Sequence, residues 1–502
     1  MKKSLAIIFA LFLLAACNKQ EEFAVQTETE LQETLAPMDP AEINLEIKTN
    51  LQSTGNFNWN DASDYMLWSA AMHGDKIITV GYGKSPFHEH KSAELNSTKH
   101  KIISKIKELE TIAKGGLKNE GSPLIYDDEN LNFIDVKIES IETIKDLRKD
   151  DMVRYIEPSG YQFFIYESQL KSSSGCSTSA ASVHSSDYRT ISPNCLVSWT
   201  YDKHNITQAW GLSTGLGITV GLIDTGVSKY QSLLGSSFSD GYSSSSRSIS
   251  KYGTYVDSWK WWSTKTDGSH DKCGHGTSMA STIASPRNND YMPVGVAYNC
   301  NLVSVRGTKN VVLDGYHEQK GVANALTGLA NTSSVKIISM SIGHIFTINR
   351  IKDAVRYAYN RGKMVIAAGG TSTSFSNGYG VIFPANMSET VAVTGITDND
   401  GYDECETCHK GSRIDFTIVM ERYWDDSRHS VCLGYYNNNK DYVGGSSVAT
   451  ATVAGIAALV WARHPSWTRS QVFNRLKESS DIYPSKSSNF GYGNIDAYQA
   501  VL

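Results

Sequence analysis

The chain contains 502 residues, of which 40% are hydrophobic and 20% are charged, and its formal net charge is −5. These values are typical of a soluble globular protein that is longer than one ordinary domain and can bury a large core. Neither the charge balance nor a basic tract favours nucleic acid as a partner, so we expect none.

The N-terminus is typical of a secretory signal. Two lysines precede an apolar run over residues 5–14, which is too short to remain as a membrane-spanning helix. The run ends in Leu-Ala-Ala-Cys at residues 14–17, which resembles the lipobox of bacterial lipoproteins. That resemblance implies a signal peptide over residues 1–16 and a lipidated Cys17. The alternative is an ordinary signal with an incidental cysteine.

The residues after Cys17 bear on the location of the protein. Asn18 stands where an aspartate is associated with retention in the inner membrane, so we expect a lipoprotein of the bacterial cell envelope, anchored in the outer membrane. The acidic run over residues 19–22 is similar to the surface-export signals of Bacteroidota lipoproteins, which implies surface exposure. The expected contact with the membrane is through lipidated Cys17.

The next two regions differ in their patterning. Residues 17–70 are acid-rich with little apolar periodicity, so we predict an acidic tether. Residues 71–167 predict a small α+β domain in a βαββαβ order. Its expected strands are 76–82, 124–126, 131–139 and 152–157, and its expected helices are 97–114 and 140–149. A serine-rich connector over residues 168–199 follows, and we expect it to be open to proteolysis.

Three motifs supply the residue types of a nucleophilic serine hydrolase. Asp224 ends an apolar strand, His275 lies in Gly-His-Gly-Thr, and Ser447 lies in Gly-Gly-Ser-Ser ahead of an apolar helix at 453–462. A serine hydroxyl needs a histidine base, and that histidine needs a carboxylate to hold its tautomer. Each residue alone would more often be structural, but their order along the chain favours a catalytic group.

The three motifs resemble those of the subtilase family of serine proteases. The resemblance implies that Asp224 orients His275, that His275 acts as general base and then acid, and that Ser447 attacks the scissile carbonyl. It also implies a three-layer α/β domain with a mainly parallel sheet over residues 200–502, preceded by the small α+β domain. The expected activity is that of an endopeptidase, which cleaves peptide or protein substrates through an acyl-enzyme without a cofactor.

A later segment fits the same resemblance. Residues 336–343 are similar to the strand that pairs with the substrate backbone, which implies substrate contacts from Ser341, Ile342 and Gly343. His344 follows where the family often has a small residue. We therefore hypothesise a narrowed or polar subsite at His344.

Residues 365–370 resemble the strand that lines the primary specificity pocket and leads to the oxyanion hole. The oxyanion region is expected to combine Gly370 with the backbone N–H of Ser447, but the family has an asparagine in the place of Gly370. Losing that amide donor in subtilisin lowers turnover by about a hundred- to a thousandfold. Thr371 or Ser372 could replace the donor, and the alternative function is a weak or inactive surface protein that binds peptides. The pocket contacts implied are Ala367, Ala368 and Gly369.

Residues 135–157 resemble the end of the inhibitor-type propeptide of subtilases. Such a propeptide assists folding and blocks the active site until it is cleaved, so the resemblance implies a zymogen. The alternative is a small accessory domain at residues 71–167.

Eight cysteines are present, and removing Cys17 leaves seven, so at least one lacks an intramolecular partner. Proximity in sequence suggests bridges between Cys176 and Cys195 and between Cys273 and Cys300. A zinc site could use Cys405-x-x-Cys408 with His429-x-x-Cys432, but we favour a disulfide that involves Cys432 and leaves one free thiol. No metal is predicted. Calcium, which many subtilases carry, is not indicated, because residues 227–230 lack extra carboxylates.

Overall fold

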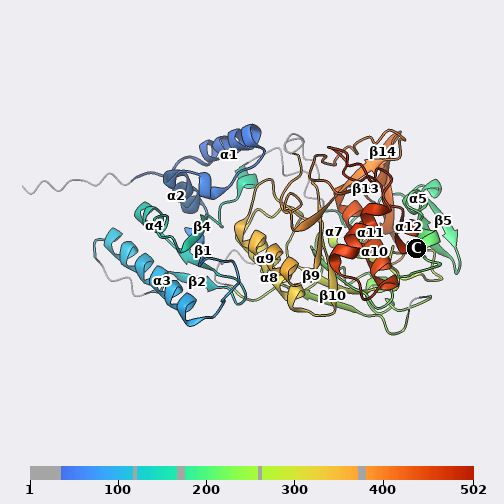
Figure 1. The fold of residues 1–502 in the computed structure, drawn as a ribbon, viewed down its shortest axis with the longest axis horizontal. Helices are drawn as coiled ribbons and strands as arrows, with labels where there is room; N and C mark the ends of the chain where they lie inside the picture. The colour runs from blue at the N-terminus through green and yellow to red at the C-terminus, as the bar shows by residue number, and fades with distance from the viewer. Residues whose placement is uncertain (1–34, 117–120, 167–175, 243, 258–262, 371–379) are drawn as a thin grey trace, which may run out of the picture. The chain divides into compact units, whose positions relative to one another are not determined.

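The computed structural model describes residues 35–116, 121–166, 176–242, 244–257, 263–370 and 380–502 (Figure 1). The predicted signal peptide and Cys17 lie outside these residues. Thr371, Ser372 and the first part of the predicted connector, up to residue 175, also lie outside them.

The predicted βαββαβ order is confirmed between residues 77 and 157. Its strands form an antiparallel sheet in the order β2-β3-β1-β4, with Ile78 opposite Val136 and Val80 opposite Ile156. The elements are β1 (Ile77–Tyr82), α3 (Ala93–Ala113), β2 (Leu124–Asp127), β3 (Phe133–Lys137), α4 (Ile141–Leu147) and β4 (Val153–Glu157), followed by the short helix η2 (Phe163–Tyr166).

The prediction of an acidic tether over residues 17–70 is wrong from residue 40 onward. Two helices, α1 (Pro40–Thr54) and α2 (Asp64–His73), and the short η1 (Trp59–Asp61) pack into the same core as the four-stranded sheet. Ile43, Ile47 and Leu51 are four residues apart and form one narrow buried stripe on α1. Acidic residues on the other faces of α1 hide this stripe in the sequence.

A second sheet of nine strands has the order β15-β14-β13-β12-β11-β10-β7-β9-β8. Neighbouring strands are parallel from β8 through β13. The pairs β13–β14 and β14–β15 are antiparallel. The strands are β7 (Thr219–Asp224), β8 (Ile249–Gly253), β9 (Asn301–Arg306), β10 (Val335–Met340), β11 (Met364–Ala368), β12 (Thr390–Thr397), β13 (Phe416–Arg422), β14 (Asp425–Leu433) and β15 (Lys440–Val443).

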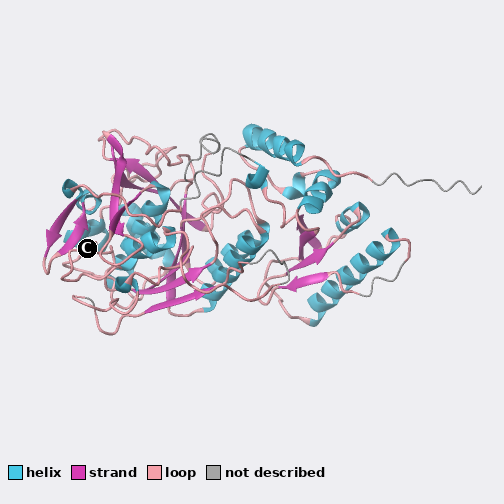
Figure 2. Cartoon of the chain, turned by 180° about the vertical axis from the view of Figure 1, so that it is seen from behind, coloured by secondary structure: helices cyan, strands magenta, loops and turns pink. Residues whose placement is uncertain are grey.

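Helices cover both faces of this sheet, which gives the predicted three-layer α/β architecture (Figures 1 and 2). On β7, Leu222 packs with α7 and α10, while the next residue, Ile223, packs with α8 and α9. The helices are α7 (His275–Ala284), α8 (Tyr316–Asn331), α9 (Asn349–Asn360), α10 (Gly445–Arg463), α11 (Arg469–Glu478), α12 (Ala497–Val501) and the short η4 (Ser232–Leu234).

α10 lies in the core, in the same layer of helices as α7. Its length and apolar composition would suffice to cross a membrane, but 94% of its apolar window is buried inside the protein. Such burial is what a central helix of a layered α/β domain requires.

The predicted connector over residues 168–199 is wrong for its last part. β5 (Tyr188–Ile191) and β6 (Cys195–Ser198) form an antiparallel pair, preceded by the short η3 (Ser185–Asp187) and followed by the short helices α5 (Trp199–Lys203) and α6 (Ile206–Ala209). Cys195 and Val197 are buried in the core of the large domain, so the domain begins before residue 200.

The cysteine pairings predicted from sequence proximity are wrong. Cys176 pairs with Cys273, and Cys405 pairs with Cys408. Because Cys405 and Cys408 are oxidised, they cannot supply zinc thiolates, and the favoured disulfide of Cys432 is also contradicted. Three of the described cysteines are buried and have free thiols: Cys195, Cys300 and Cys432. At least one free thiol is expected, because seven cysteines remain when Cys17 is set aside.

Candidate active site

Asp224 is the last residue of β7, which lies between β10 and β9 in the middle of the large sheet. Side chains at the carboxyl ends of parallel strands meet the loops that leave that edge. Asp224 is fully buried, and its Oδ1 accepts a hydrogen bond from the N–H of Thr225 at 2.8 Å. This carboxylate is therefore held at the edge where a site can form.

His275 opens α7, and its Nδ1 lies 2.8 Å from Oδ1 of Asp224. An ionised carboxylate only accepts, so Nδ1 carries the proton and Nε2 presents a lone pair. Burial lowers the pKa of His275, but the Asp224 carboxylate more than offsets this and raises it above 6.5. The pair has the tautomer and electrostatics of an oriented general base.

Asp271 is a residue of this site that the sequence interpretation missed. Its Oδ1 accepts from the backbone N–H groups of both residues before His275 at 2.8 Å, and its Oδ2 accepts from Thr277 Oγ1 at 2.7 Å. This fully buried carboxylate shapes the loop and caps the start of α7. A carboxylate four residues before a helix-opening histidine is the signal that could have identified it.

Ser447 is the third residue of α10, where backbone N–H groups have no partner within the helix. The hydroxyl of Ser341 donates to the carbonyl of Ser447 at 2.9 Å, which joins the predicted substrate strand to this helix. α10 also packs against α7, which carries His275. Within the described residues, no hydrogen bond joins the Ser447 hydroxyl to His275.

Gly370 stands beside the start of α10. Its N–H donates to Ser446 Oγ at 3.3 Å, and the same hydroxyl donates to the Gly370 carbonyl at 2.8 Å. The structure thus brings the predicted oxyanion residue next to the neighbour of Ser447. Ala367, Ala368 and Gly369 lead into it and are buried.

The imidazole of His409 occupies the space that a side chain at position 370 would need. A Cβ on Gly370 would lie 2.8 Å from His409 Cγ, and the backbone there has φ +135°. His409 is 3% exposed and donates from Nδ1 to the Gly380 carbonyl at 2.7 Å. Burial lowers the pKa of His409, so the ring is neutral and Nε2 is an acceptor.

The predicted substrate strand is paired within the chain at Gly343. Its N–H donates to the Val311 carbonyl at 3.0 Å, and its carbonyl accepts from the N–H of Leu313 at 3.1 Å. Ser341 and Ile342 are buried beside it. A substrate that used the backbone of Gly343 would have to replace Val311 and Leu313.

His344, the residue of the subsite hypothesis, is 2% exposed. Its ring meets Phe164 of η2 edge to face at 5.3 Å and Phe346 at 4.1 Å. In this state the ring is covered by the N-terminal region instead of facing an open subsite.

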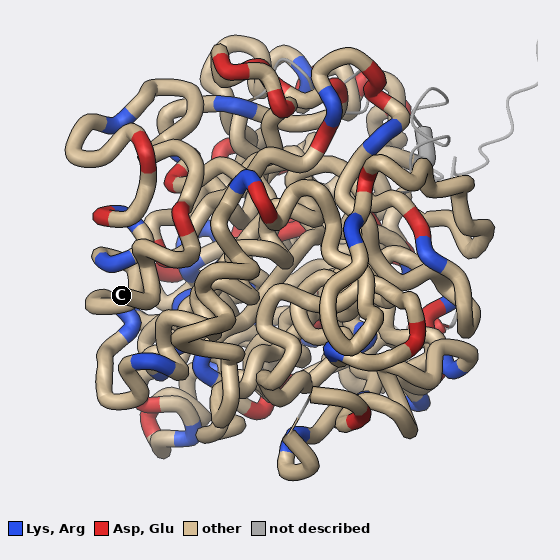
Figure 3. Tube along the Cα trace, turned by 90° about the vertical axis from the view of Figure 1, so that its right-hand side faces the viewer, with Lys and Arg blue, Asp and Glu red and all other residues tan. Residues whose placement is uncertain are grey.

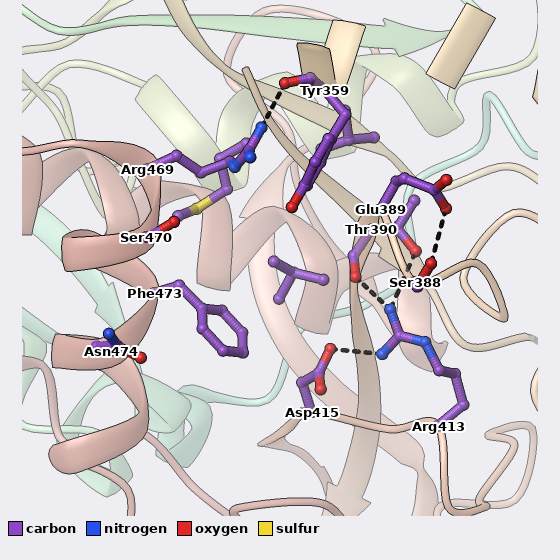
Figure 4. Close-up of a pocket in the computed structure, with 13 residues that line it drawn as sticks. Tyr359, Ser388, Glu389, Thr390, Arg413, Asp415, Arg469, Ser470, Phe473 and Asn474 are labelled. Atoms are coloured by element: carbon purple, nitrogen blue, oxygen red, sulfur yellow. Dashed lines mark hydrogen bonds and ion pairs between the residues drawn. The ribbon is translucent and has the colours of Figure 1, made fainter. Parts of the chain in front are cut away.

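A cavity of about 450 Å³ lies at the opposite edge of the sheet, where β11 and β12 begin (Figure 4). Arg413 is bound to Asp415 at 2.7 Å, and the Arg469 guanidinium donates to the Tyr359 carbonyl. None of the predicted site residues lines this cavity.

Along the Cα trace of Figure 3, the positions of Lys and Arg are interspersed with those of Asp and Glu. Within the described residues, no group of three or more His, Cys, Asp or Glu side chains could hold a metal ion.

Known proteins match the same part of the chain. The sequence model of the subtilase family matches residues 215–494. Thermitase of Thermoactinomyces vulgaris is 28% identical over 299 residues, which cover 60% of this chain and 94% of thermitase. A thermostable alkaline protease of Halalkalibacterium halodurans is 30% identical over 312 residues, which cover 61% of this chain and 73% of that protein.

The fold has a solved counterpart in fervidolysin of Fervidobacterium pennivorans, a keratinolytic enzyme related to subtilisin. The two share 17% identity at a TM-score of 0.57, over 85% of this chain and 60% of fervidolysin. With the match over residues 215–494, the nine-stranded sheet and the hydrogen bond between Asp224 and His275, this chain belongs to the subtilase family and is a subtilisin-like serine endopeptidase.

Proposed function

We propose that Asp224, His275 and Ser447 form the catalytic triad of this endopeptidase. The observation that carries the proposal is the 2.8 Å hydrogen bond between His275 Nδ1 and Asp224 Oδ1, made by fully buried Asp224. Ser447 Oγ attacks the scissile carbonyl while His275 Nε2 takes its proton, and His275 then protonates the departing amine. Water hydrolyses the acyl-enzyme by the same route in reverse.

The oxyanion of this mechanism is stabilised by the backbone N–H of Ser447. That group lies in the first turn of α10, where free N–H groups and the helix dipole favour negative charge. Neutral His409 donates from Nδ1 to Gly380, so its Nε2 offers no proton in place of the missing amide. From the donors of the described residues, which do not include Thr371 and Ser372, we therefore propose a catalyst with a weaker oxyanion hole than subtilisin.

One observation favours a second candidate function, a surface protein that only binds peptides. Gly370 carries no side-chain donor, and His409 fills the space where one would stand. A binding cleft needs the substrate strand but has no need of an activated hydroxyl at Ser447. The two candidate functions therefore differ in whether the hydroxyl oxygen of Ser447 is a reactive nucleophile.

Labelling with a fluorophosphonate probe separates the two candidates. We expect intact mass to show one adduct, located at Ser447, that is absent in Ser447→Ala and His275→Ala. Ser446→Ala serves as the matched control, because its hydroxyl lies one residue away and bonds to Gly370. A protein that stays unlabelled after limited proteolysis of the connector would contradict the triad and support the binding function.

We further propose that residues 37–166 act as an inhibitory propeptide. Glu157 accepts from the N–H of Asn349 at 2.8 Å and Arg350 at 3.2 Å, at the start of α9. Fully buried Arg350 and Asp135 form an ion pair across the same contact. Phe164 lies over His344, next to the predicted substrate strand.

The location proposed is the bacterial outer membrane, through a lipid on Cys17, with display at the cell surface. Support comes from the Leu-Ala-Ala-Cys sequence at residues 14–17 and the charges before it. In cells fed an alkyne fatty acid, we expect label on the wild type and none on Cys17→Ser. Equal labelling of the two would contradict the anchor, and protease shaving of intact cells would test surface display.

A further inference from the structure

Residues 176–184, here named the connector segment, are joined covalently to the loop that carries His275. Cys176 forms a disulfide with Cys273, across a separation of 97 residues. Gly274 has φ +100°, and a side chain there would collide with the carbonyl of Ser177. The connector segment therefore touches the loop at the residue directly before His275. It lies outside the part matched by the family's sequence model, which begins at residue 215.

The same segment follows the strand that leads to Ser447. The N–H of Ala181 donates to Asp441 Oδ1 at 2.8 Å, and the N–H of His184 donates to the Tyr442 hydroxyl at 3.0 Å. Asp441 and Tyr442 belong to β15, which runs directly into the glycines before Ser447. The connector segment thus contacts both flanks of the triad, the His275 loop and the approach to Ser447.

Just beyond the connector segment, the chain is anchored by Asp187, which is fully buried. Arg428 Nε donates to Asp187 Oδ2 at 2.6 Å, and Arg422 and Tyr442 also donate to this carboxylate. A disulfide at one end and a buried ion-pair network at the other fix the path of the exposed residues between them.

The order of events in acyl transfer determines which half of the substrate lies against the connector segment. His275 protonates the departing amine, so residues C-terminal to the scissile bond leave past His275. The N-terminal half lies along Ser341–Gly343 on the other side. We infer that the connector segment walls the leaving-group side of the cleft and determines which residues are accepted there. This inference rests on the proposed triad.

A covalently held wall discriminates by size. It cannot retract when a bulky residue arrives, so small leaving groups pass and large side chains beyond the scissile bond are disfavoured. Cys176 is an exposed residue while Cys273 is buried, so we expect a reductant to attack the disulfide at Cys176. A dithiol supplies two electrons and two protons, becomes a disulfide itself, and leaves both cysteines as thiols.

The test uses two peptide substrates with the same N-terminal half. One ends in p-nitroanilide, and the other continues through several residues with bulky aromatic side chains. We would compare kcat/KM for both substrates in the wild type and in Cys176→Ser/Cys273→Ser, each divided by the fraction labelled with fluorophosphonate at Ser447. The full chain from residue 18 is used after limited proteolysis, with intact mass confirming that residues from 176 onward remain.

We expect the double variant to raise kcat/KM for the extended substrate about tenfold, which is about 1.4 kcal/mol of transition-state stabilisation. The anilide rate is expected to stay unchanged, because its leaving group is small. Treating the wild type with a dithiol should reproduce the rise, whereas the double variant should not respond. Ser185→Ala, an exposed position just beyond the segment, serves as the control and should show no rise.

A further variant covers the case in which the double variant does not fold. Asp441→Asn keeps the disulfide and weakens the contact with Ala181, so a smaller rise for the extended substrate is expected. An unchanged ratio of the two substrates in reduced wild type and in Asp441→Asn overturns the inference. Absence of fluorophosphonate labelling in every preparation overturns the proposed triad instead.

Discussion

Gly370 and His409 form a coupled pair at the residue scale. The ring of His409 fills the space beside the Gly370 Cα, and the backbone at Gly370 has φ +135°. An asparagine introduced at 370 alone would therefore meet the ring before its amide could reach an oxyanion. Among the described residues, the lack of a side-chain donor at position 370 therefore depends on both Gly370 and His409.

We predict that Gly370→Asn alone gives no gain in turnover, whereas Gly370→Asn/His409→Gly raises kcat by up to about a hundredfold, the range that one oxyanion donor supplies. The measurement is kcat and KM on a peptide anilide, with His409→Gly alone as the control. A gain from the single asparagine variant would show that the ring is no obstacle.

The acid limb of the pH–rate profile follows from the raised pKa of His275. His275 must be neutral to accept the Ser447 proton, so activity is expected to fall as the pH drops through a value above 6.5. In Asp224→Asn the carboxylate that raises this pKa is absent, so the limb should move to lower pH. We also expect kcat to fall about 3 × 10⁴-fold, which is the effect of removing the triad aspartate in subtilisin.

The measurement for Asp224→Asn is kcat/KM of a peptide anilide between acid and neutral pH. A limb that keeps its position in Asp224→Asn would show that another group titrates. Asp202→Asn is the matched control, because Asp202 pairs with Arg189 at the surface.

At the scale of elements, Asp271 links the His275 loop to α7. It accepts hydrogen bonds from three backbone N–H groups and from the hydroxyls of Thr225 and Thr277, so one carboxylate defines both the loop and the helix start. Removing its charge leaves those donors with weaker acceptors.

Asp271→Asn is therefore expected to lower the free energy of unfolding by about 1–3 kcal/mol. Chemical denaturation gives this value, and Asp202→Asn should change it by less than about 0.5 kcal/mol. Equal stability of the two variants would mean that the loop does not depend on Asp271.

Contacts between residues 37–166 and helices α8 and α9 of the large domain operate at the scale of the whole molecule. Asp135 and Arg350 are both fully buried, and Asp135 also accepts from the hydroxyl of Tyr316 at 2.8 Å. Removing one partner of a buried pair leaves an uncompensated charge, which costs about 3–5 kcal/mol.

Asp135→Ala should therefore weaken the hold of the N-terminal region and increase fluorophosphonate labelling of the uncleaved chain. Glu142→Ala, which breaks the exposed pair with Lys145, is the control and should leave labelling unchanged. Circular dichroism would confirm that both variants are folded. Equal labelling of folded wild type and folded Asp135→Ala would contradict the inhibitory role of this contact.

The sequence by itself determined the family and the layered α/β fold. Local patterns carry that information, because strands and helices follow from the period of apolar residues and the motifs at 224, 275 and 447 are short. It also predicted the βαββαβ order before the large domain. The motifs named Asp224 and His275 as candidates, and the structure adds a hydrogen bond between them, on which the proposed triad rests.

Only the tertiary structure decided which distant residues meet. It pairs Cys176 with Cys273 instead of nearer cysteines, buries the stripe of α1 within a core, and places His409 against Gly370. These contacts join positions far apart in the chain, so no local pattern encodes them. Their physical basis is close packing, in which each side chain takes the space that its neighbours leave.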